Sequence, residues 1–205
     1  MITEMVEAFS AIIARVGRDT ITNDRLTFLQ EFLKRPQEVA SIIPSSRFLE
    51  RRVVQSGAVG AAKTIVELGS GTGGTTRAIL QAMRPDARLL SIEINSGFHQ
   101  SIQQIPDNRL IAHLGSAHEL RKTLTEYRLD APDVIISGIP FSLMDEKLGT
   151  QIIQEVSSAL AKDGRFIAYQ FRDRVETLSR PILGEAHVEV EYLNIPPVRI
   201  FRWEK

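Results

Sequence analysis

The chain has 205 residues, the length of one domain or of one domain with an appendage. Its 25 lysines and arginines are balanced by 25 aspartates and glutamates, so it lacks the basic excess that proteins dedicated to nucleic acids usually carry. The absence of cysteine excludes disulfides, thiolate metal sites and cysteine nucleophiles, and it suits a reducing compartment.

The first part of the chain has the apolar spacing of helices. Apolar residues fall on one stripe of 1–17, and a second helix is expected over 23–34, before Pro36. A third helix is expected over 47–57. We therefore expect a helical extension over 1–57.

After Ala58 the pattern changes to alternating strands and helices. Short apolar runs such as 134–136 are typical of parallel strands that are covered on both faces. Strands are expected at 64–68, 88–93, 109–114, 133–137 and 165–171, and helices at 73–83, 97–104, 117–127 and 147–160. Two more strands, 187–193 and 198–203, are separated by too few residues for a parallel crossover, so they form an antiparallel hairpin. Residues 58–205 thus predict an α/β domain whose seven-stranded, mostly parallel sheet ends in an antiparallel strand. This is the Rossmann-like layout of class I methyltransferases, whereas a plain dinucleotide-binding fold stays parallel.

A glycine-rich loop follows the first of these strands, within 66–74. Glycines allow a tight turn and the close approach of a ligand to the backbone, next to the free N–H groups of the following helix. Gly69, Gly71 and Gly74 also satisfy the dinucleotide pattern GxGxxG. The carboxylate of Glu67, however, suits the ammonium of a methionine moiety and would repel a pyrophosphate. The string resembles motif I of S-adenosylmethionine-dependent methyltransferases, and a turn without a ligand is the alternative. The cofactor-binding candidates are Glu67, Gly69, Ser70, Gly71, Thr72 and Gly73.

The next two strand ends add candidates for the rest of that cofactor. Glu93 lies 24 positions after Gly69, near the about 20-residue offset of an acid that accepts from ribose hydroxyls. Ile94 follows it, and a solvated glutamate at a strand end is the alternative. The third strand leads into Ser116 and Ala117, where related methyltransferases often place an aspartate for the adenine amino group. Ser116 could take that role or serve only the turn.

The fourth strand runs into the segment Ser137-Gly138-Ile139-Pro140-Phe141, which should lie beside the reacting methyl group. It partly matches the Asn/Asp-Pro-Pro-Tyr/Phe motif of amino-group methyltransferases. Gly138 replaces the Asn or Asp whose carbonyl accepts from a planar nitrogen, which argues against methylation of adenine N6. The carbonyls of Ser137 or Gly138 could still orient an amine, and Phe141 could face the resulting cation or be an ordinary core residue. Candidate bases for an amine are Tyr169, Asp173 and His118.

Three further segments, 28–36, 39–46 and 194–197, complete a pattern that covers nearly the whole chain. Together with the motifs above, they make the chain resemble bacterial phospholipid N-methyltransferases and, more distantly, rRNA adenine dimethyltransferases. The resemblance implies S-adenosylmethionine as the cofactor and stepwise methylation of phosphatidylethanolamine to phosphatidylcholine at the cytosolic membrane face. It also implies a lid over the cofactor that includes Ser45 and Ser46. Capping of the next helix by Ser46 is a compatible alternative.

Access to a lipid requires contact with a bilayer. The helix over 1–17 could lie in the membrane interface or pack against protein. Arg47, Arg51 and Arg52, with Lys34 and Arg35, could meet lipid phosphates or form a solvated face. No apolar run reaches the roughly 18 residues of a membrane span, and the start lacks a secretory signal. We therefore expect a cytoplasmic chain that could bind the membrane peripherally.

Three other functions stay open at this point. The chain could methylate a soluble amine, or a base of RNA or DNA, although its zero net charge disfavours nucleic acid. It could also bind a nucleotide without turnover. No metal is expected, since the histidines share no ligand spacing.

Overall fold

The structure is a computed structural model, and it describes residues 46–194 and 197–205. The helices expected over 1–17 and 23–34 and the lid residue Ser45 lie outside the described residues. The helix expected over 47–57 forms as α4 (Arg47–Ser56), and the Oγ of Ser46 caps it by accepting from the N–H of Leu49 at 3.2 Å.

A seven-stranded sheet with the strand order β3-β2-β1-β4-β5-β7-β6 runs through the described residues. The strands are β1 (Thr64–Leu68), β2 (Arg88–Glu93), β3 (Leu110–Leu114), β4 (Val134–Ser137), β5 (Arg165–Gln170), β6 (His187–Glu191) and β7 (Val198–Glu204). β1 to β5 are parallel, and β7 pairs antiparallel with both β5 and β6. The predicted parallel sheet and its antiparallel hairpin are therefore confirmed.

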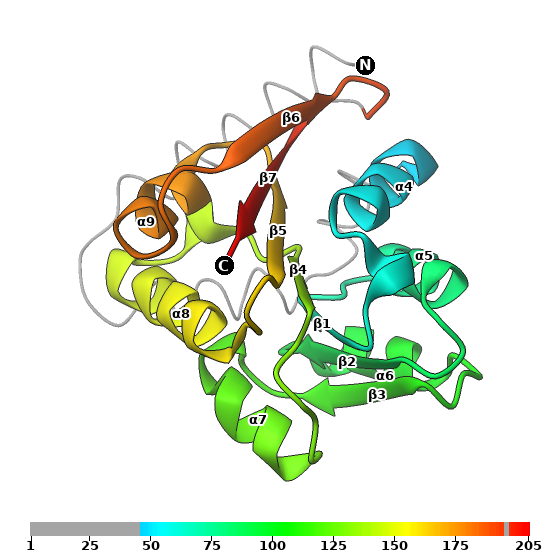
Figure 1. The fold of residues 1–205 in the computed structure, drawn as a ribbon. Helices are drawn as coiled ribbons and strands as arrows, with labels where there is room; N and C mark the ends of the chain where they lie inside the picture. Colours follow the sequence, from blue (N-terminus) through cyan, green and yellow to red (C-terminus); the bar gives the residue numbers. More distant parts are fainter. Residues whose placement is uncertain (1–45, 195–196) are drawn as a thin grey trace. The chain divides into compact units, whose positions relative to one another are not determined.

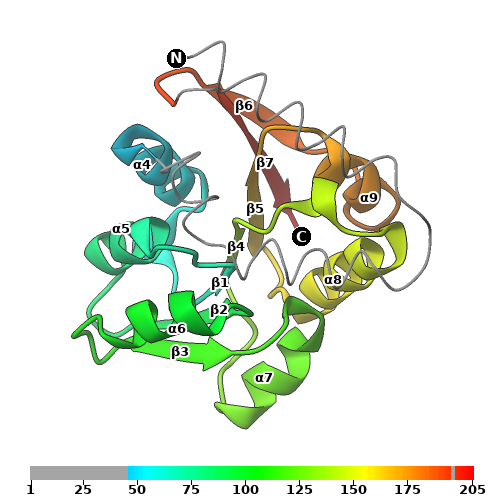
Figure 2. The same ribbon diagram turned by 180° about the vertical axis from the view of Figure 1, so that it is seen from behind.

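Helices cover both faces of this sheet (Figures 1 and 2). The further helices are α5 (Gly74–Ala82), α6 (Ser96–Gln103), α7 (Leu120–Glu126), α8 (Glu146–Ala159) and α9 (Arg174–Leu183), with short 3-10 turns η1 (Val59–Ala61), η2 (Ala117–Glu119) and η3 (Phe141–Leu143). α4, α5 and α6 lie on one face, and α7, α8 and α9 lie on the other. β1 is buried along its whole length, so its charged residue, Glu67, needs polar partners.

The helix α9 has no counterpart among the expected elements. Pro181 lies inside it, and an interior proline removes a backbone donor, which argues against a helix. The proline sits in the last turn, however, and the apolar side chains of Val175 and Leu178 are buried, with Leu178 packed over Gly149 of α8. Tertiary packing of one apolar face therefore stabilises a helix that its own sequence does not favour.

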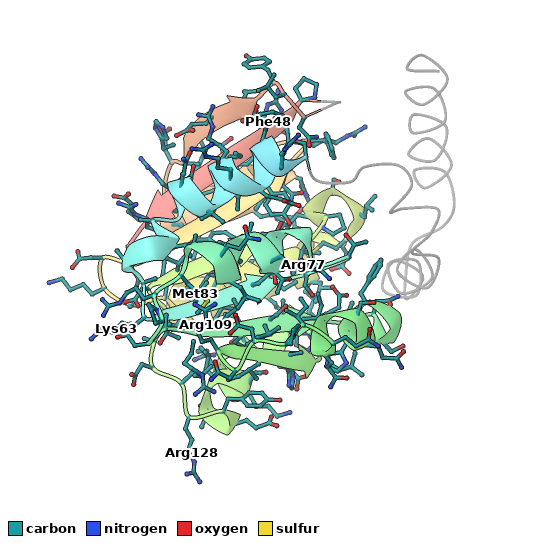
Figure 3. All side chains as sticks on the ribbon, turned by 90° about the vertical axis from the view of Figure 1, so that its right-hand side faces the viewer. Phe48, Lys63, Arg77, Met83, Arg109 and Arg128 are labelled. Carbon is teal, nitrogen blue, oxygen red and sulfur yellow. The ribbon has the colours of Figure 1, made fainter. Side chains whose placement is uncertain are left out.

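Arg109 fixes the end of α5, whose beginning carries the glycine-rich loop. Its Nη2 donates to the carbonyl of Leu80 at 2.7 Å, and its Nη1 donates to the carbonyl of Met83 at 3.3 Å (Figure 3). The carboxylate of Asp107 accepts from Arg109 at 2.6 Å, and this hydrogen bond lowers the pKa of Asp107 to about 2. A cation thus satisfies carbonyls at the end of the helix, where the helix dipole favours positive charge.

We expect Arg109→Leu to lower the free energy of unfolding by about 1–2 kcal/mol, because helix-end carbonyls and a carboxylate lose a charged donor. The stabilisation by the pair should also fade as the pH falls from about 4 toward 2, since the folded-state pKa of Asp107 lies below its unfolded value. Urea unfolding followed by circular dichroism measures both effects. Arg84→Leu is the matched control, because its pair with Asp86 is on the surface at the same helix end. Equal stability of the two variants would contradict this role.

Candidate active site

The loops that follow β1 and β4 lie side by side at the carboxyl edge of the sheet. The N–H of Gly138 donates to the carbonyl of Leu68 at 2.9 Å, and the N–H of Gly69 donates to the carbonyl of Ile92 at 2.9 Å. The strand order reverses at β1, with β2 and β3 on one side of it and β4 and β5 on the other. Ligands of open α/β sheets bind at such a switch point. The fold thus brings the two strongest motifs of the sequence together.

Three glycines shape the loop between β1 and α5. Gly69, Gly71 and Gly73 have φ angles of 77°, 52° and 84°, a region that disfavours residues with a Cβ. A Cβ on Gly69 would also press on Ile139 of the neighbouring loop at 3.1 Å, whereas one on Gly71 would meet no described atom within 4 Å. The loop therefore packs against protein at Gly69 and leaves space at Gly71, where a ligand can approach the backbone.

The two residues between these glycines differ in their surroundings. Ser70 is buried, and its Oγ has no hydrogen-bond partner among the described residues. Thr72 is exposed, and its carbonyl accepts from Nη1 of Arg77 at 3.1 Å. A buried hydroxyl without a partner costs free energy, so Ser70 is suited to a polar ligand that completes its hydrogen bonding.

Glu67 is the most deeply buried ionisable group of the site, with no exposed surface. Its Oε2 accepts from Oγ1 of Thr76 at 2.6 Å and from Oγ of Ser91 at 2.9 Å. Its Oε1 has no partner within the described part of the chain. One oxygen is thus held in place, and the other is a buried acceptor without a partner among the described residues.

Burial raises the pKa of Glu67 to about 7, against the lowering effect of its two hydroxyl donors. The charge of Glu93 nearby raises the pKa further. A cation placed at the free oxygen would lower the pKa again, because an opposite charge favours the ionised form. These features are compatible with the ammonium group that the sequence analysis assigns to Glu67, and that assignment stays a prediction.

Glu93 closes β2 next to the glycine-rich loop. Its Oε2 accepts from the N–H of Gly71 at 2.9 Å, and its Oε1 accepts from the N–H of Asn95 at 2.9 Å. Each carboxylate oxygen keeps a further lone pair, so ribose hydroxyls can still donate to it. The N–H of Gly71 thus orients Glu93, the acid that the sequence analysis assigns to the ribose. The alternative of a solvated glutamate does not fit, because Glu93 is only 3% exposed.

Apolar surface is exposed at the ends of β2 and β3. Ile94 is 36% exposed and Leu114 is 49% exposed. Ser116 and Ala117 follow β3, where Ser116 Oγ lies 2.8 Å from Nδ1 of His118 and Ala117 is buried. These surfaces are suited to an adenine ring, and the serine hydroxyl is already hydrogen-bonded within the turn.

Gly138 and Tyr169 meet at the edge where methyl transfer is expected. A Cβ on Gly138 would collide with the hydroxyl of Tyr169, and it would lie 3.0 Å from the carbonyl oxygen of Gly69. The phenol oxygen is 3.2 Å from Oγ1 of Thr75 in the first turn of α5. The hydroxyl of Tyr169 therefore occupies the space into which an Asn or Asp side chain at position 138 would extend.

The other residues of the segment 137–141 differ in their burial and contacts. Ser137 is buried, and its Oγ accepts from the N–H of Ile139 at 3.3 Å, so its hydroxyl serves the turn. Pro140 is half-buried at the edge. Phe141 is completely buried, which agrees with the alternative of a core residue and leaves no ring face open to solvent. Of the other proposed bases, Asp173 is exposed before α9.

Sequence reasoning missed the hydroxyl groups that surround Glu67 and Tyr169. Thr75 and Thr76 come from the first turn of α5, and Ser91 comes from β2. Ser91 lies two positions before Glu93, so the strand period places both side chains on one face, and this signal could have found it. The threonines follow the last glycines of the loop directly, but nothing local shows which hydroxyl would reach β1.

Two segments that carried the family resemblance meet in the structure. The Oδ1 of Asn194, a residue that is 1% exposed, accepts from the N–H of Ser46 at 3.1 Å. The hydroxyl of Ser46 caps α4, as the alternative to cofactor binding proposed. Within 46–194 and 197–205, no helix is long and apolar enough to cross a membrane, and no group of three metal-binding side chains comes together.

Comparisons with known proteins extend these observations. No protein-family model matches the chain. An ornithine lipid N-methyltransferase from Singulisphaera acidiphila is 30% identical over 177 residues, which cover 85% of this chain and 92% of that protein. The solved N-methyltransferase NodS from Bradyrhizobium japonicum WM9, in complex with S-adenosyl-L-homocysteine, has a TM-score of 0.64 at 13% identity and covers 89% of this chain and 99% of its own. The O-methyltransferase TomG from Streptomyces achromogenes, in complex with S-adenosylmethionine, has a TM-score of 0.64 at 12% identity and covers 96% of each chain.

The solved structures share the fold, which confirms the class I methyltransferase architecture expected from the sequence. The match to the relative from Singulisphaera acidiphila spans 85% of this chain and 92% of that protein. The chain belongs to the bacterial lipid N-methyltransferases that use S-adenosylmethionine as the methyl donor.

Proposed function

We propose that this protein transfers methyl groups from S-adenosylmethionine to the amine of a membrane lipid headgroup. The kinship with an ornithine lipid N-methyltransferase over 92% of that protein's length carries this proposal. Phosphatidylethanolamine, implied by the sequence resemblance, and an ornithine lipid, indicated by the relative, are the two candidate acceptors. Both present an ammonium on a short flexible chain near an anionic group.

The reacting edge supports an aliphatic amine over a nucleic-acid base. A planar base nitrogen is oriented by a side-chain carbonyl, and Gly138 provides none. The hydroxyl of Tyr169 fills that space instead, and a single oxygen can accept from an amine that rotates freely. This arrangement disfavours the alternative of an adenine methyltransferase.

When bound, S-adenosylmethionine supplies an electrophilic methyl carbon on a sulfonium sulfur. Glu67 would hold the ammonium of its methionine part through the free Oε1, and Glu93 would accept from its ribose hydroxyls. The exposed side chains of Ile94 and Leu114 would cover its adenine. Because the leaving sulfur needs no acid, the protein's main task is to align the amine with the methyl group.

Tyr169 would orient the amine without accepting its proton. Burial raises the pKa of Tyr169, and the charge of Glu67 raises it further, so the phenol stays protonated at neutral pH. Its hydroxyl can donate to Thr75 while its lone pair accepts from an amine N–H. The ammonium of the acceptor would first lose a proton to water, because the phenol does not take it. The nitrogen lone pair would then be held in one direction as the N–C bond forms, while the electron pair of the broken C–S bond stays on sulfur.

The affinity for S-adenosylhomocysteine should fall about tenfold between about pH 8 and pH 6, because the ionised fraction of a carboxyl with a pKa of about 7 falls by that factor. Glu67→Gln should bind weakly at both pH values and lose this dependence. Isothermal titration calorimetry measures the dissociation constants. Glu119→Gln, which changes an exposed carboxylate, should keep the wild-type profile. A pH-dependent affinity in Glu67→Gln would contradict the assignment.

The acceptor is identified by incubating the full chain with methyl-labelled S-adenosylmethionine and one lipid at a time. We expect label in phosphatidylethanolamine, in ornithine lipid, or in both, because each offers the amine that the edge at Gly138 accommodates. Phosphatidylcholine, free ethanolamine, free ornithine and RNA are the comparison samples. Label in a soluble amine or in RNA, with none in either lipid, would refute the proposal.

Tyr169→Phe should lower kcat roughly 10- to 100-fold, because the amine loses a hydrogen bond that aligns it. The affinity for S-adenosylhomocysteine should stay within roughly twofold of the wild type, since the ring is kept. Steady-state kinetics and calorimetry separate the two effects. Tyr127→Phe, which removes a hydroxyl that contacts His113, controls for the loss of a phenol elsewhere. A loss of activity in Tyr127→Phe as large as in Tyr169→Phe would argue against a role in alignment.

A further inference from the structure

Large apolar side chains are exposed where β6 turns toward β7. Tyr192 is 74% exposed and Leu193 is 62% exposed, and Phe48 in the first turn of α4 is 47% exposed. Single apolar residues on a surface are ordinary, but neighbouring ones mark an interaction site. We name Phe48, Tyr192 and Leu193 the apolar corner.

Hydrogen bonds hold the two elements of the apolar corner together. The buried side chain of Asn194 accepts from the N–H of Ser46, two residues before Phe48. Arg52, further along α4, pairs with Glu189 at 3.2 Å and with Glu191 at 3.4 Å on β6. α4 therefore lies beside the turn end of the hairpin, as Figures 1 and 2 show from opposite sides. The three side chains of the apolar corner therefore lie on two elements that are fixed to each other.

The register of the sheet places the apolar corner at the edge that carries the active site. Arg199 near the start of β7 pairs with Gln170 at the end of β5, so the turn before β7 lies beyond the carboxyl end of β5. Tyr169, one residue earlier in β5, contacts the reacting edge at Gly138. A surface that docks on the apolar corner therefore lies at the same edge of the sheet as Gly138 and Tyr169, where we propose that the amine is held.

The charged residues around the apolar corner indicate what kind of surface it can bind. Arg47 and Arg51 are exposed on α4, and neither pairs with a carboxylate of a described residue. The guanidinium of Arg47 lies 6.0 Å from the ring centre of Phe48. The negative charges nearby face other cations, since the charge of Arg77 acts on Glu50 and the carboxylates of β6 pair with Arg52. Aromatic and leucine side chains beside unpaired arginines fit an anionic bilayer surface.

We propose that the apolar corner, with Arg47 and Arg51, docks on the anionic phospholipid surface of a membrane and so presents the reacting edge to lipid headgroups. This inference rests on the proposed function, because it supplies the route by which a membrane lipid reaches the site. A second copy of the chain is a poorer occupant, since a symmetric contact would set Arg47 and Arg51, which have no carboxylate partner among the described residues, against the same arginines of the other copy.

The test measures binding of the full chain to vesicles that contain no acceptor, made of phosphatidylcholine alone or of equimolar phosphatidylcholine and phosphatidylglycerol. We expect binding to the anionic vesicles only. Arg47→Gln with Arg51→Gln should weaken it about 25-fold, at about fivefold for each arginine. Tyr192→Ser with Leu193→Ser should weaken it about tenfold or more.

Matched controls separate this surface from general effects of charge and apolarity. Val188→Ser removes an exposed apolar residue near the start of β6, away from the apolar corner at its end. This variant should bind like the wild type. Lys63→Gln with Arg128→Gln removes two charges that lie far from Phe48 (Figure 3), and it should also bind like the wild type. All variants should keep their affinity for S-adenosylhomocysteine, which shows that they are folded.

Several outcomes would overturn the docking proposal. These are vesicle binding that is unchanged in both corner variants, equal losses in the controls, or binding that depends only on residues 1–44 in a deletion variant. A changed mass in sedimentation velocity with unchanged vesicle binding would assign the corner to self-association and also overturn it. Turnover of a monomeric short-chain amine lipid tests the proposed function separately. That turnover can persist if the docking surface is wrong, and vesicle binding through the corner can persist if the acceptor is wrong.

Discussion

The site depends on one buried carboxylate that is only half satisfied. Thr76 and Ser91 donate to one oxygen of Glu67, and the other oxygen has no partner among the described residues. Removing a carboxylate from water is costly, and the raised pKa records this cost. A cation bound at the free oxygen would offset this cost, which is why we propose that the neighbouring loop, with its three glycines at positive φ, admits an ammonium group.

At the carboxyl edge of the sheet, two pairs of strands contribute different parts of the candidate site. β1 and β2 contribute the acids that we propose bind the cofactor, and β4 and β5 contribute the surface at which we propose the acceptor is aligned. The hydrogen bond from Gly138 to Leu68 joins these halves, so a shift of one loop moves the other. The proposed donor and acceptor positions are thus joined by a backbone contact that needs no side chain at position 138.

Local patterns in the sequence were sufficient to predict the positions of the strands, of the glycine-rich loop and of the neighbouring acids Glu67 and Glu93. Apolar runs identify buried parallel strands, and the short link at 194–197 leaves only an antiparallel hairpin. The contacts that could not be predicted join distant segments. Tyr169 fills the space beside Gly138 across the β4–β5 pair, and Asn194 binds Ser46 over 148 positions. The motif at 137–141 could not decide whether Phe141 faces the amine or belongs to the core, and the structure buries its ring completely.

The position of β7 has a consequence for biosynthesis. β6 precedes β7 in the chain, yet β7 lies between β5 and β6 in the sheet. On the ribosome, β6 therefore emerges before the strand that separates it from β5, and the edge of β5 stays open until residues 198–204 leave the exit tunnel. Unpaired strand edges invite pairing with other chains. The nascent protein is accordingly exposed to misassembly at this edge from the time β5 emerges until β7 pairs with it.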